Sequence, residues 1–249
     1  MAFPVSHKTV FVLDHSPQFS MACDVVDFDS LKTSMQAAAR QIPIAPIYKT
    51  MWTSVSESIL EYCRIVWDIF PPDSQEQKLL RFVVSDAGGS GQETHMLNFW
   101  DNKDQTIDVI KNGLASVGRP EPESRKKSAY AKGYNISNGI EAGMKILCEY
   151  TDKQKLESQK KKQNENGAIG VLNRGRIIVL THLENQEHLH SILDTFKSQV
   201  RKIPFVQRSN NIGILKKWGC YTRKHRPKLR HSSLVCQLAT IHLSLIPGH

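Results

Sequence analysis

Asp14 and Ser16 are the residues of this 249-residue chain whose types and positions are best suited to chemistry. They follow the run Thr9-Val10-Phe11-Val12-Leu13, whose branched and aromatic side chains are typical of a strand buried on both faces of a parallel sheet. In open α/β sheets, ligands bind at the carboxyl ends of the strands, which is where Asp14 is expected. An Asp-x-Ser turn at that edge either offers oxygens to a hard cation or holds the turn by capping backbone amides.

If the turn binds a cation, the pattern that it most resembles is the metal-ion-dependent adhesion site of von Willebrand factor A domains. That site is written Asp-x-Ser-x-Ser, with a threonine and a second aspartate from later loops. Gln18 stands in place of the last serine, and Asn135 and Ser137 stand near the expected threonine. The strand that should precede the second aspartate is followed by Thr181-His182-Leu183. Because only the first two of five ligand positions are intact, the pattern favours a structural turn over a loaded metal site.

Other sites that use a carboxylate, a glycine-rich loop or a zinc ion each lack a required residue here. A phosphotransferase of the haloacid-dehalogenase type needs Asp-x-Asp, with the second acid as proton donor. Asp14 would be the nucleophile, but Ser16 stands where the second acid is required. The stretch Gly88-Gly89-Ser90-Gly91 is not followed by the Lys-Ser or Lys-Thr of a phosphate-binding loop. Possible zinc ligands match no short zinc-binding spacing: Cys220, His225, His231, Cys236 and His242. No complete catalytic set and no cofactor motif is present, and the alternatives to a non-catalytic interaction module are a metal-dependent ligand-binding domain of the von Willebrand type and, less favoured, a phosphatase-like enzyme that uses Asp14.

Positive charge is concentrated near the carboxyl end of the chain. Residues 201–231 hold ten Lys or Arg and no acid, and the remainder has 23 basic against 24 acidic residues. Five residues of this segment are candidates for phosphate contacts with RNA or DNA: Arg223, Lys224, Arg226, Lys228 and Arg230. Trp218 and Tyr221 stand beside them and are able to stack on bases. A solvated loop and a nuclear import signal explain the same charges equally well.

Alternating strand and helix patterns fill most of the remaining sequence. Apolar runs predict strands at residues 79–85, 96–100, 176–181 and within 234–246. Helical spacing of apolar residues predicts helices over residues 54–70, 106–117, 136–147 and 189–200. Ser54 and Glu57 form a capping box at the start of the first helix, and residues 17–48 are expected to be a loop or a short helix followed by a loop. The alternation predicts a doubly wound, mostly parallel α/β sheet flanked by helices.

A single domain accounts for this pattern. We expect it to occupy residues 1–205, with residues 206–231 as a basic loop or arm and residues 232–249 as the final strand of the same domain. Gly139 and Gly143, one helical turn apart, are expected to let their helix pack close to the sheet. No apolar run approaches the roughly 20 residues needed to cross a bilayer. The five scattered cysteines are expected to be reduced thiols in an intracellular protein.

Several stretches of the chain form a specific combination: His7 to His15, Lys49-Thr50-Met51-Trp52-Thr53, Glu57-Ser58, Glu61-Tyr62-Cys63-Arg64, Trp67-Asp68-Ile69-Phe70-Pro71, Arg81-Phe82-Val83-Val84-Ser85-Asp86 and Asn173-Arg174-Gly175-Arg176-Ile177-Ile178. This combination resembles the N-terminal domain of the Asunder family, which is also named Integrator complex subunit 13. The likeness extends from about residue 7 to about residue 200 and resumes near Cys236. The basic residues 206–231 do not match the family pattern.

The resemblance implies a von Willebrand factor A-like, Rossmann-type domain with a degenerate metal site, no catalytic activity and no small-molecule substrate. It implies as partner another von Willebrand-type subunit of the Integrator complex, which cleaves small nuclear RNA precursors. It also implies links to dynein recruitment at the nuclear envelope and to mitotic and meiotic progression, and therefore a nuclear and perinuclear location. The family continues into a β-rich domain and a C-terminal tail, so we expect a fragment, a shortened isoform or paralogue, or an imperfect gene model.

Overall fold

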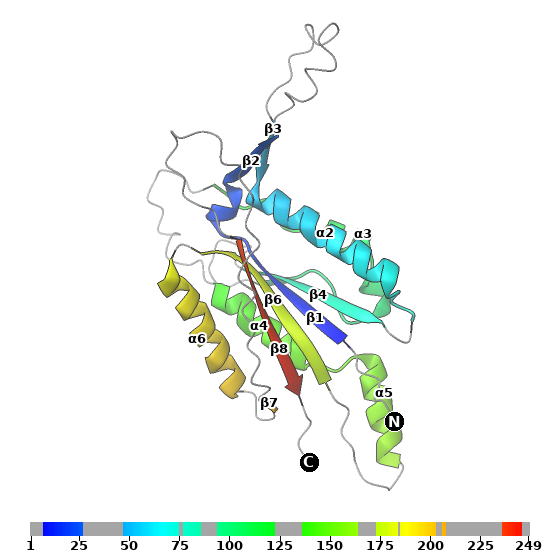
Figure 1. The fold of residues 1–249 in the computed structure, drawn as a ribbon. Coiled ribbons are helices and arrows are strands. Elements are labelled where there is room, and N and C mark those ends of the chain that lie inside the picture. Colours follow the sequence, from blue (N-terminus) through cyan, green and yellow to red (C-terminus); the bar gives the residue numbers. More distant parts are fainter. Residues whose placement is uncertain are drawn as a thin grey trace, which may run out of the picture.

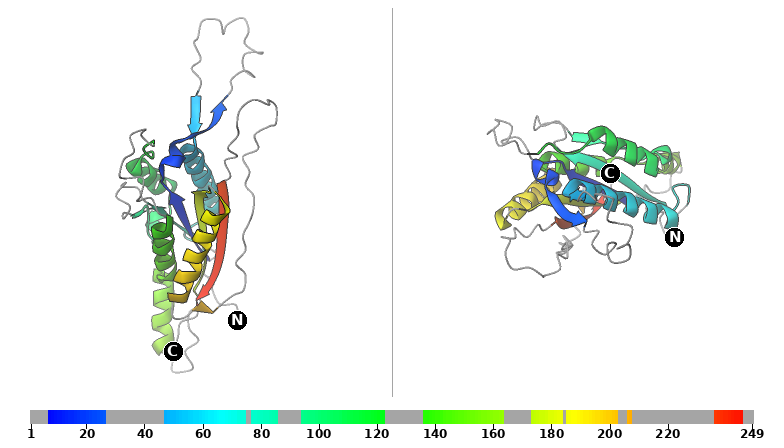
Figure 2. Two further views of the ribbon diagram at one scale, coloured as in Figure 1. Left: turned by 90° about the vertical axis from the view of Figure 1, so that its left-hand side faces the viewer. Right: turned by 90° about the horizontal axis from the view of Figure 1, so that it is seen from above.

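The computed structural model describes residues 7–26, 47–74, 77–85, 94–122, 136–163, 173–183, 185–202, 206–207 and 236–245. These residues form a six-stranded sheet, a separate two-stranded sheet, and helices on both faces of the larger sheet (Figures 1 and 2). Within these ranges, no helix combines the length and the apolar character that a membrane-spanning helix needs.

Three parallel strands form the centre of the large sheet: β1 (His7–Asp14), β4 (Lys78–Ser85) and β6 (Asn173–His182). Antiparallel strands extend it on both sides: β5 (Thr94–Met96) beside β4, β8 (Cys236–Leu245) beside β6, and β7 (Val206–Gln207) beside β8. The order across the sheet is β5-β4-β1-β6-β8-β7. The predicted α/β fold is confirmed, and its sheet is mixed, parallel at the centre and antiparallel at both margins.

Helices cover both faces of this sheet (Figures 1 and 2). One face packs against α2 (Met51–Ile69) and α3 (Ile107–Val117), and the other against α4 (Ile136–Cys148) and α6 (Gln186–Lys202). A further helix, α5 (Asp152–Gln163), follows α4 and extends past the amino ends of the central strands. Two short 3₁₀ turns are η1 (Pro17–Ser20) and η3 (Asn102–Asp104).

Alternate residues of β1 face opposite layers of the core. Val10 and Val12 are buried in a cluster with residues of α4 and α6, whereas Phe11 and Leu13 are buried with residues of α2 and α3. Residues 8–14 are all buried. The strand is covered on both faces, which explains why the sequence shows an unbroken apolar run instead of an alternation of apolar and polar residues.

The two glycines of α4 let this helix pack directly on the sheet, as predicted. A Cβ atom added at Gly139 would lie 2.7 Å from Cβ of Ser85 and 2.8 Å from Cγ1 of Val12. A Cβ added at Gly143 would lie 3.0 Å from Cγ2 of Val12. A side chain at Gly139 would therefore push α4 away from β1 and β4, while the contact at Gly143 is less close.

The first long helix begins earlier than the predicted capping box of Ser54 and Glu57, so that prediction is wrong. Thr50 is the N-cap of α2, and its Oγ1 accepts a hydrogen bond from the Thr53 N–H at 3.2 Å. Glu57 instead forms an ion pair with Lys49. The helix includes Met51 and Trp52 because both side chains are buried in the core, and this tertiary packing overrides the local capping signal.

The predicted strand at residues 96–100 is also corrected, because β5 ends at Met96. Beyond it, the side chain of Asn98 takes the place of a neighbouring strand. The Phe82 N–H donates to Asn98 Oδ1 at 3.1 Å, and Asn98 Nδ2 donates to the Leu80 carbonyl at 2.8 Å. The Leu80 N–H donates to Gln105 Oε1 at 2.8 Å. Two buried side-chain amides therefore satisfy the outer edge of β4.

Part of the segment predicted as a loop at residues 17–48 is a small sheet. After η1, β2 (Ala22–Val26) pairs with β3 (Ile47–Thr50) in antiparallel register, from Ala22↔Thr50 to Val26↔Ile47. This sheet stands at the carboxyl edge of the large sheet, above α2 (Figure 1). The prediction missed it because strands of four or five residues carry too little pattern to be distinguished from a loop.

Candidate functional site

The carboxylate of Asp14 ends β1 and is almost fully buried at the carboxyl edge of the sheet. Its Oδ1 accepts a hydrogen bond from the Ser16 N–H at 2.9 Å. Its Oδ2 accepts a hydrogen bond from the Thr181 hydroxyl at 2.6 Å. Asp14 therefore joins the end of β1 both to its own turn and to the end of β6.

The structure brings together three of the residues that the metal-site pattern singled out. Asp14, Ser16 and Thr181 are all buried at this edge, and the amide-capping interpretation of the Asp-x-Ser turn is confirmed by the bond to the Ser16 N–H. Ser137 is engaged elsewhere, because its hydroxyl lies 3.1 Å from that of Thr195 on α6. Gln18 belongs to η1. Asn135 lies outside the described residues.

His15 is buried beside this carboxylate and is held on three sides. Its ring packs edge-on against Trp52, with 4.8 Å between the ring centroids, and its Nε2–H donates to the Gly118 carbonyl at 3.2 Å. Its backbone N–H donates to the Ser85 carbonyl at 3.2 Å. Burial lowers the pKa of His15 below its usual value, and the Gly118 carbonyl and the charge of Asp14 oppose this only in part. The ring is therefore neutral at physiological pH and supplies no positive charge to Asp14.

The chemistry open to this edge is limited. In the part of the chain that the structure describes, no group of three or more His, Cys, Asp or Glu side chains could hold a metal ion. Among the cysteines whose side chains the structure describes, Cys63 and Cys148 are free thiols, and burial raises the pKa of both, that of Cys63 to about 12. At neutral pH these thiols are protonated and weakly nucleophilic. Asp14 with its two partners is thus a hydrogen-bonded junction between strands.

Several sites named from the sequence fall on residues that the structure does not describe. The glycine-rich stretch 88–91 is one of them. The others are three possible zinc ligands and the base-stacking residues in 218–231, and the candidate phosphate contacts Arg223, Lys224, Arg226, Lys228 and Arg230. Two more possible zinc ligands, Cys236 and His242, lie in β8, where the backbone is described but the side chains are not.

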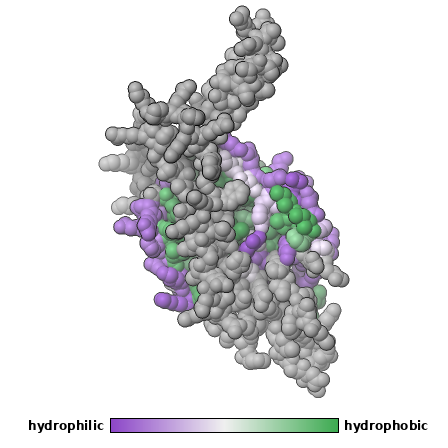
Figure 3. Space-filling view, viewed as in Figure 1, coloured by the Kyte–Doolittle hydropathy of each residue, from purple (hydrophilic) through white to green (hydrophobic). Residues whose placement is uncertain are grey.

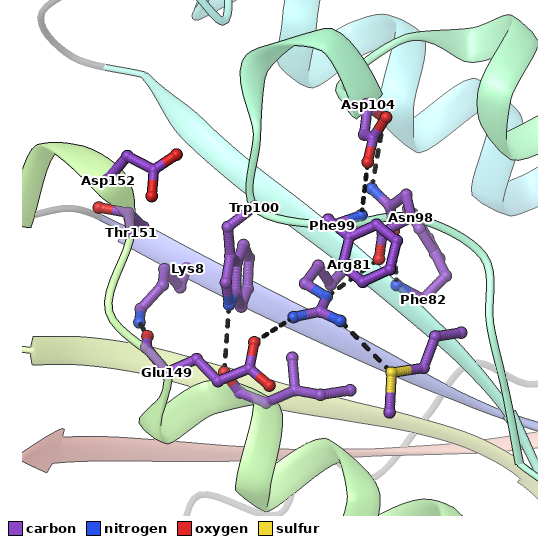
Figure 4. A network of polar contacts seen from close by, with 12 residues as sticks. Lys8, Arg81, Phe82, Asn98, Phe99, Trp100, Asp104, Glu149, Thr151 and Asp152 are labelled. Carbon is purple, nitrogen blue, oxygen red and sulfur yellow. Dashed lines mark hydrogen bonds and ion pairs between the residues drawn. The ribbon is translucent and has the colours of Figure 1, made fainter.

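A second polar cluster, which the sequence did not reveal, lies at the opposite end of the sheet where α4 ends (Figure 4). The last carbonyls of a helix have no partner within it. Lys8, which is 1% exposed, donates its Nζ–H to the Glu149 carbonyl, and Trp100 Nε1–H donates to the Ile146 carbonyl at 3.1 Å. A cation at this position also interacts favourably with the negative end of the helix dipole.

Arg81 completes this cluster from the neighbouring strand. This residue is also 1% exposed, and its Nε–H donates to the Asn98 carbonyl at 3.1 Å. Its guanidinium forms an ion pair with the carboxylate of Glu149 and lies 5.4 Å from the ring of Trp100 (Figure 4). Lys8, Arg81, Trp100 and Glu149 are called the α4 clamp below. The sequence pattern that indicates this clamp is a charged residue at a core-facing position of each strand. Lys8 lies on the same face of β1 as Val10, and Arg81 lies on the same face of β4 as Val83.

Replacing Lys8 with Met is expected to flatten the dependence of stability on alkaline pH. Burial lowers the pKa of Lys8 from 10.5 to about 7, while Cys148 and Glu149 partly oppose the shift. The unfolded chain therefore binds more protons than the folded chain between these two values, and unfolding free energy rises with pH in that window. The contribution is about 1 kcal/mol per pH unit.

Urea denaturation at several pH values between about 7 and 10 measures this slope. The matched control is Lys145→Met, because Lys145 is a lysine on α4 whose side chain is 74% exposed. The unfolding free energy of the parent chain and of the control should rise across this pH window. For Lys8→Met, the rise should be smaller by about 1 kcal/mol per pH unit. An unchanged slope in Lys8→Met would show that Lys8 remains charged in the folded chain.

The fold is a mixed α/β sheet with helices on both faces, and its candidate site is one buried carboxylate at the sheet edge, held by hydrogen-bond donors of the chain itself. A family model described as "Cell cycle and development regulator Mat89Bb" matches residues 3–216. The chain belongs to this family.

Curated relatives carry the two names that the sequence resemblance indicated. Integrator complex subunit 13 of Homo sapiens is 36% identical over 201 residues, covering 80% of this chain and 26% of the relative. That of Xenopus tropicalis is 35% identical over 201 residues, with the same coverage of 80% and 26%. Protein asunder of Drosophila pseudoobscura pseudoobscura is 32% identical over 197 residues, covering 79% of this chain and 27% of the relative. The chain thus spans about a quarter of the length of these relatives, and the predicted family is confirmed.

Proposed function

We propose that this chain is a non-catalytic interaction module of the Integrator complex, built on a von Willebrand factor A-like domain. The observation that carries the proposal is the bonding of Asp14, whose two carboxylate oxygens accept from Ser16 and Thr181. A residue that could ligate a cation in such a domain instead holds two strand ends together. The assignment to this assembly is supported by the relatives that are named Integrator complex subunit 13.

The partner proposed from the family resemblance is another von Willebrand-type Integrator subunit, with further Integrator subunits around it. The function is then assembly of a complex that processes small nuclear RNA. A nuclear location with a perinuclear cytoplasmic fraction, dynein localisation, and roles in mitosis and meiosis belong to the same proposal. The family description as a cell cycle and development regulator is consistent with the last of these.

The proposed domain organisation follows the sequence pattern. Residues 1–205 form the von Willebrand factor A-like domain, residues 206–231 form a basic loop or arm, and residues 232–249 return to the domain as its final strand. The arm's five basic residues are proposed to contact RNA or DNA, in addition to the protein partner. Support for this contact comes from the ten basic residues and the absence of acids within residues 201–231.

A surface suited to a protein partner lies on the carboxyl-terminal half of α2, where apolar residues gather in Figure 3. Ile65 and Ile69 are one helical turn apart and are 45% and 63% exposed. The ion pairs of Arg64 with Glu61 and Asp68 lie next to them on the same helix. An apolar centre with charged residues at its rim is the usual composition of a protein–protein interface.

The test is a pull-down of the whole chain with its von Willebrand-type Integrator partner, followed by measurement of the affinity. The double variant Ile65→Ser/Ile69→Ser is expected to weaken binding by at least about tenfold, or 1.4 kcal/mol. The matched control is Met21→Ser/Met96→Ser, because these residues are 41% and 46% exposed and lie outside α2. Neither change should alter the unfolding free energy by more than about 0.5 kcal/mol.

Two outcomes would count against these assignments. If the folded parent chain fails to bind the partner, the proposed function is wrong. If the parent binds and both double variants bind equally well, the function stands but the interface does not include the exposed face of α2.

A further inference from the structure

Helix α5 is unusual in this fold because it has no apolar face. Its twelve residues contain five lysines and two acids, and its leucine, Leu156, is 55% exposed. Figures 1 and 2 show that it extends beyond the amino ends of the central strands, away from the layers that cover the sheet. An isolated helix of this length is marginal in water, so α5 depends on what holds its first turn.

The first turn of α5 is held by a network of buried polar residues. Thr151 and Gln154 form a reciprocal capping box, in which the Thr151 N–H donates to Gln154 Oε1 at 2.9 Å and the Gln154 N–H donates to Thr151 Oγ1 at 3.2 Å. Both side chains are almost fully buried. Lys153 adds a hydrogen bond from its Nζ to Gln77 Oε1 at 3.0 Å, which ties the helix to the start of β4.

The α4 clamp fixes the residues immediately before this turn. Lys8 bonds the carbonyl of Glu149 and Arg81 pairs with its carboxylate, and Figure 4 shows Thr151 and Asp152 next to Lys8. Burying a lysine and an arginine side chain is unfavourable even when both are hydrogen-bonded. The arrangement is therefore an expensive way to end α4, but it fixes the direction in which α5 leaves the domain.

We propose that α5 is a rigid docking arm for an acidic segment of a partner protein. The side chains described beyond the first turn of α5, those of Lys155, Leu156 and Gln159, are exposed, so a fixed direction adds little to the stability of the domain, whereas a docking surface gains affinity from being preorganised. The charge supports this occupant: Lys155 is paired with Asp152 at 2.9 Å, while three consecutive lysines at positions 160–162 end the helix. Their positive charge complements an acidic segment.

The composition of α5 favours an acidic protein segment over nucleic acid. It contains neither arginine, which binds phosphate through two parallel hydrogen bonds, nor an aromatic residue for stacking on bases. Exposed Leu156 offers an apolar contact that a peptide can use and a phosphate backbone cannot. The inference uses neither Asp14 nor the apolar residues of α2, so it goes beyond the proposed function and does not depend on it.

The test compares two variants of the whole chain that lose the same number of charges. The α5 variant, called the arm variant because it changes the docking arm and not the basic residues 206–231, is Lys155→Gln/Lys160→Gln/Lys161→Gln/Lys162→Gln. Glutamine preserves helix propensity at these positions. The matched control carries the same change at four lysines on α3, α4 and α6: Lys111, Lys145, Lys197 and Lys202. The probes are a fluorescein-labelled peptide of alternating glutamate and leucine, and a labelled single-stranded oligouridylate, both followed by fluorescence anisotropy.

The peptide is expected to bind the parent chain and to lose at least about tenfold in affinity with the arm variant but not with the control variant, a change of 1.4 kcal/mol. Leu156→Ser should weaken the peptide and leave oligouridylate unaffected. The proposal is overturned if the peptide does not bind the parent, if both quadruple variants weaken it equally, or if α5 binds oligouridylate and not the peptide. Thermal melting of each variant verifies that the domain remains folded.

Discussion

A chain that ends at Ser233 is expected to lose the folded domain. This truncation removes β8, which pairs with β6 over ten residues, from Asn173↔Leu245 to His182↔Cys236. β6 contributes Ile177 and Val179 to the core and Thr181 to the bond with Asp14. The ladder between β6 and β8 contributes about 0.5–1.5 kcal/mol per hydrogen bond, and a whole domain is stable by only about 5–15 kcal/mol.

The matched control ends at Pro247, beyond the last residue of β8, and should melt like the parent chain. Thermal melting and size-exclusion chromatography distinguish the two truncations. Chains ending at Ser233 that do fold should self-associate, because the truncation exposes the backbone of β6 as an open sheet edge. A monomer that ends at Ser233 and melts at the parent temperature would show that β8 is dispensable and that the stable domain ends near residue 205.

Elements with a long and regular pattern could be predicted from the sequence, because their residue types reflect how they are buried. β1 and β4 were recognised from unbroken apolar runs, and α4 from apolar residues at helical spacing. Where tertiary contacts decide the outcome, the pattern was insufficient. Burial of Met51 and Trp52 sets the start of α2.

The site could be predicted only where its contacts are local. Ser16 is two residues from Asp14, so the capped turn follows from the Asp-x-Ser spacing. Thr181 is 167 residues away from Asp14, and Lys8 is 141 residues away from Glu149. Those contacts depend on the register of β1 with β6 and on where α4 ends, neither of which a single sequence specifies. The prediction of an edge strand at residues 96–100 is wrong for a related reason, because the side chain of Asn98 takes the place of a neighbouring strand beside β4.

Gly139→Ala is expected to destabilise the domain by about 2–3 kcal/mol, although alanine is the better helix former by about 1 kcal/mol. The new methyl group would lie 2.7 Å from Cβ of Ser85, 2.8 Å from Cγ1 of Val12 and 2.9 Å from Oγ of Ser85. These atoms belong to β4 and β1, two interior strands that are paired on both sides. Neither strand can move alone, so α4 must be displaced from the sheet and lose contacts of Ile140 and Met144 in the core.

Gly143→Ala, one turn further along α4, is the matched control because it brings the same gain in helix propensity. Its methyl group would meet one atom at 3.0 Å, Cγ2 of Val12, and the next at 3.5 Å, so a small adjustment of one side chain relieves the contact. Its net effect should therefore stay within about 1 kcal/mol of the parent. Urea denaturation of both variants measures the difference between the two sites. If the two alanine variants are equally stable, α4 does not pack more tightly at Gly139, over Ser85, than at Gly143, over the middle of β1. The close approach at Gly139 would then not be what fixes the helix on the sheet.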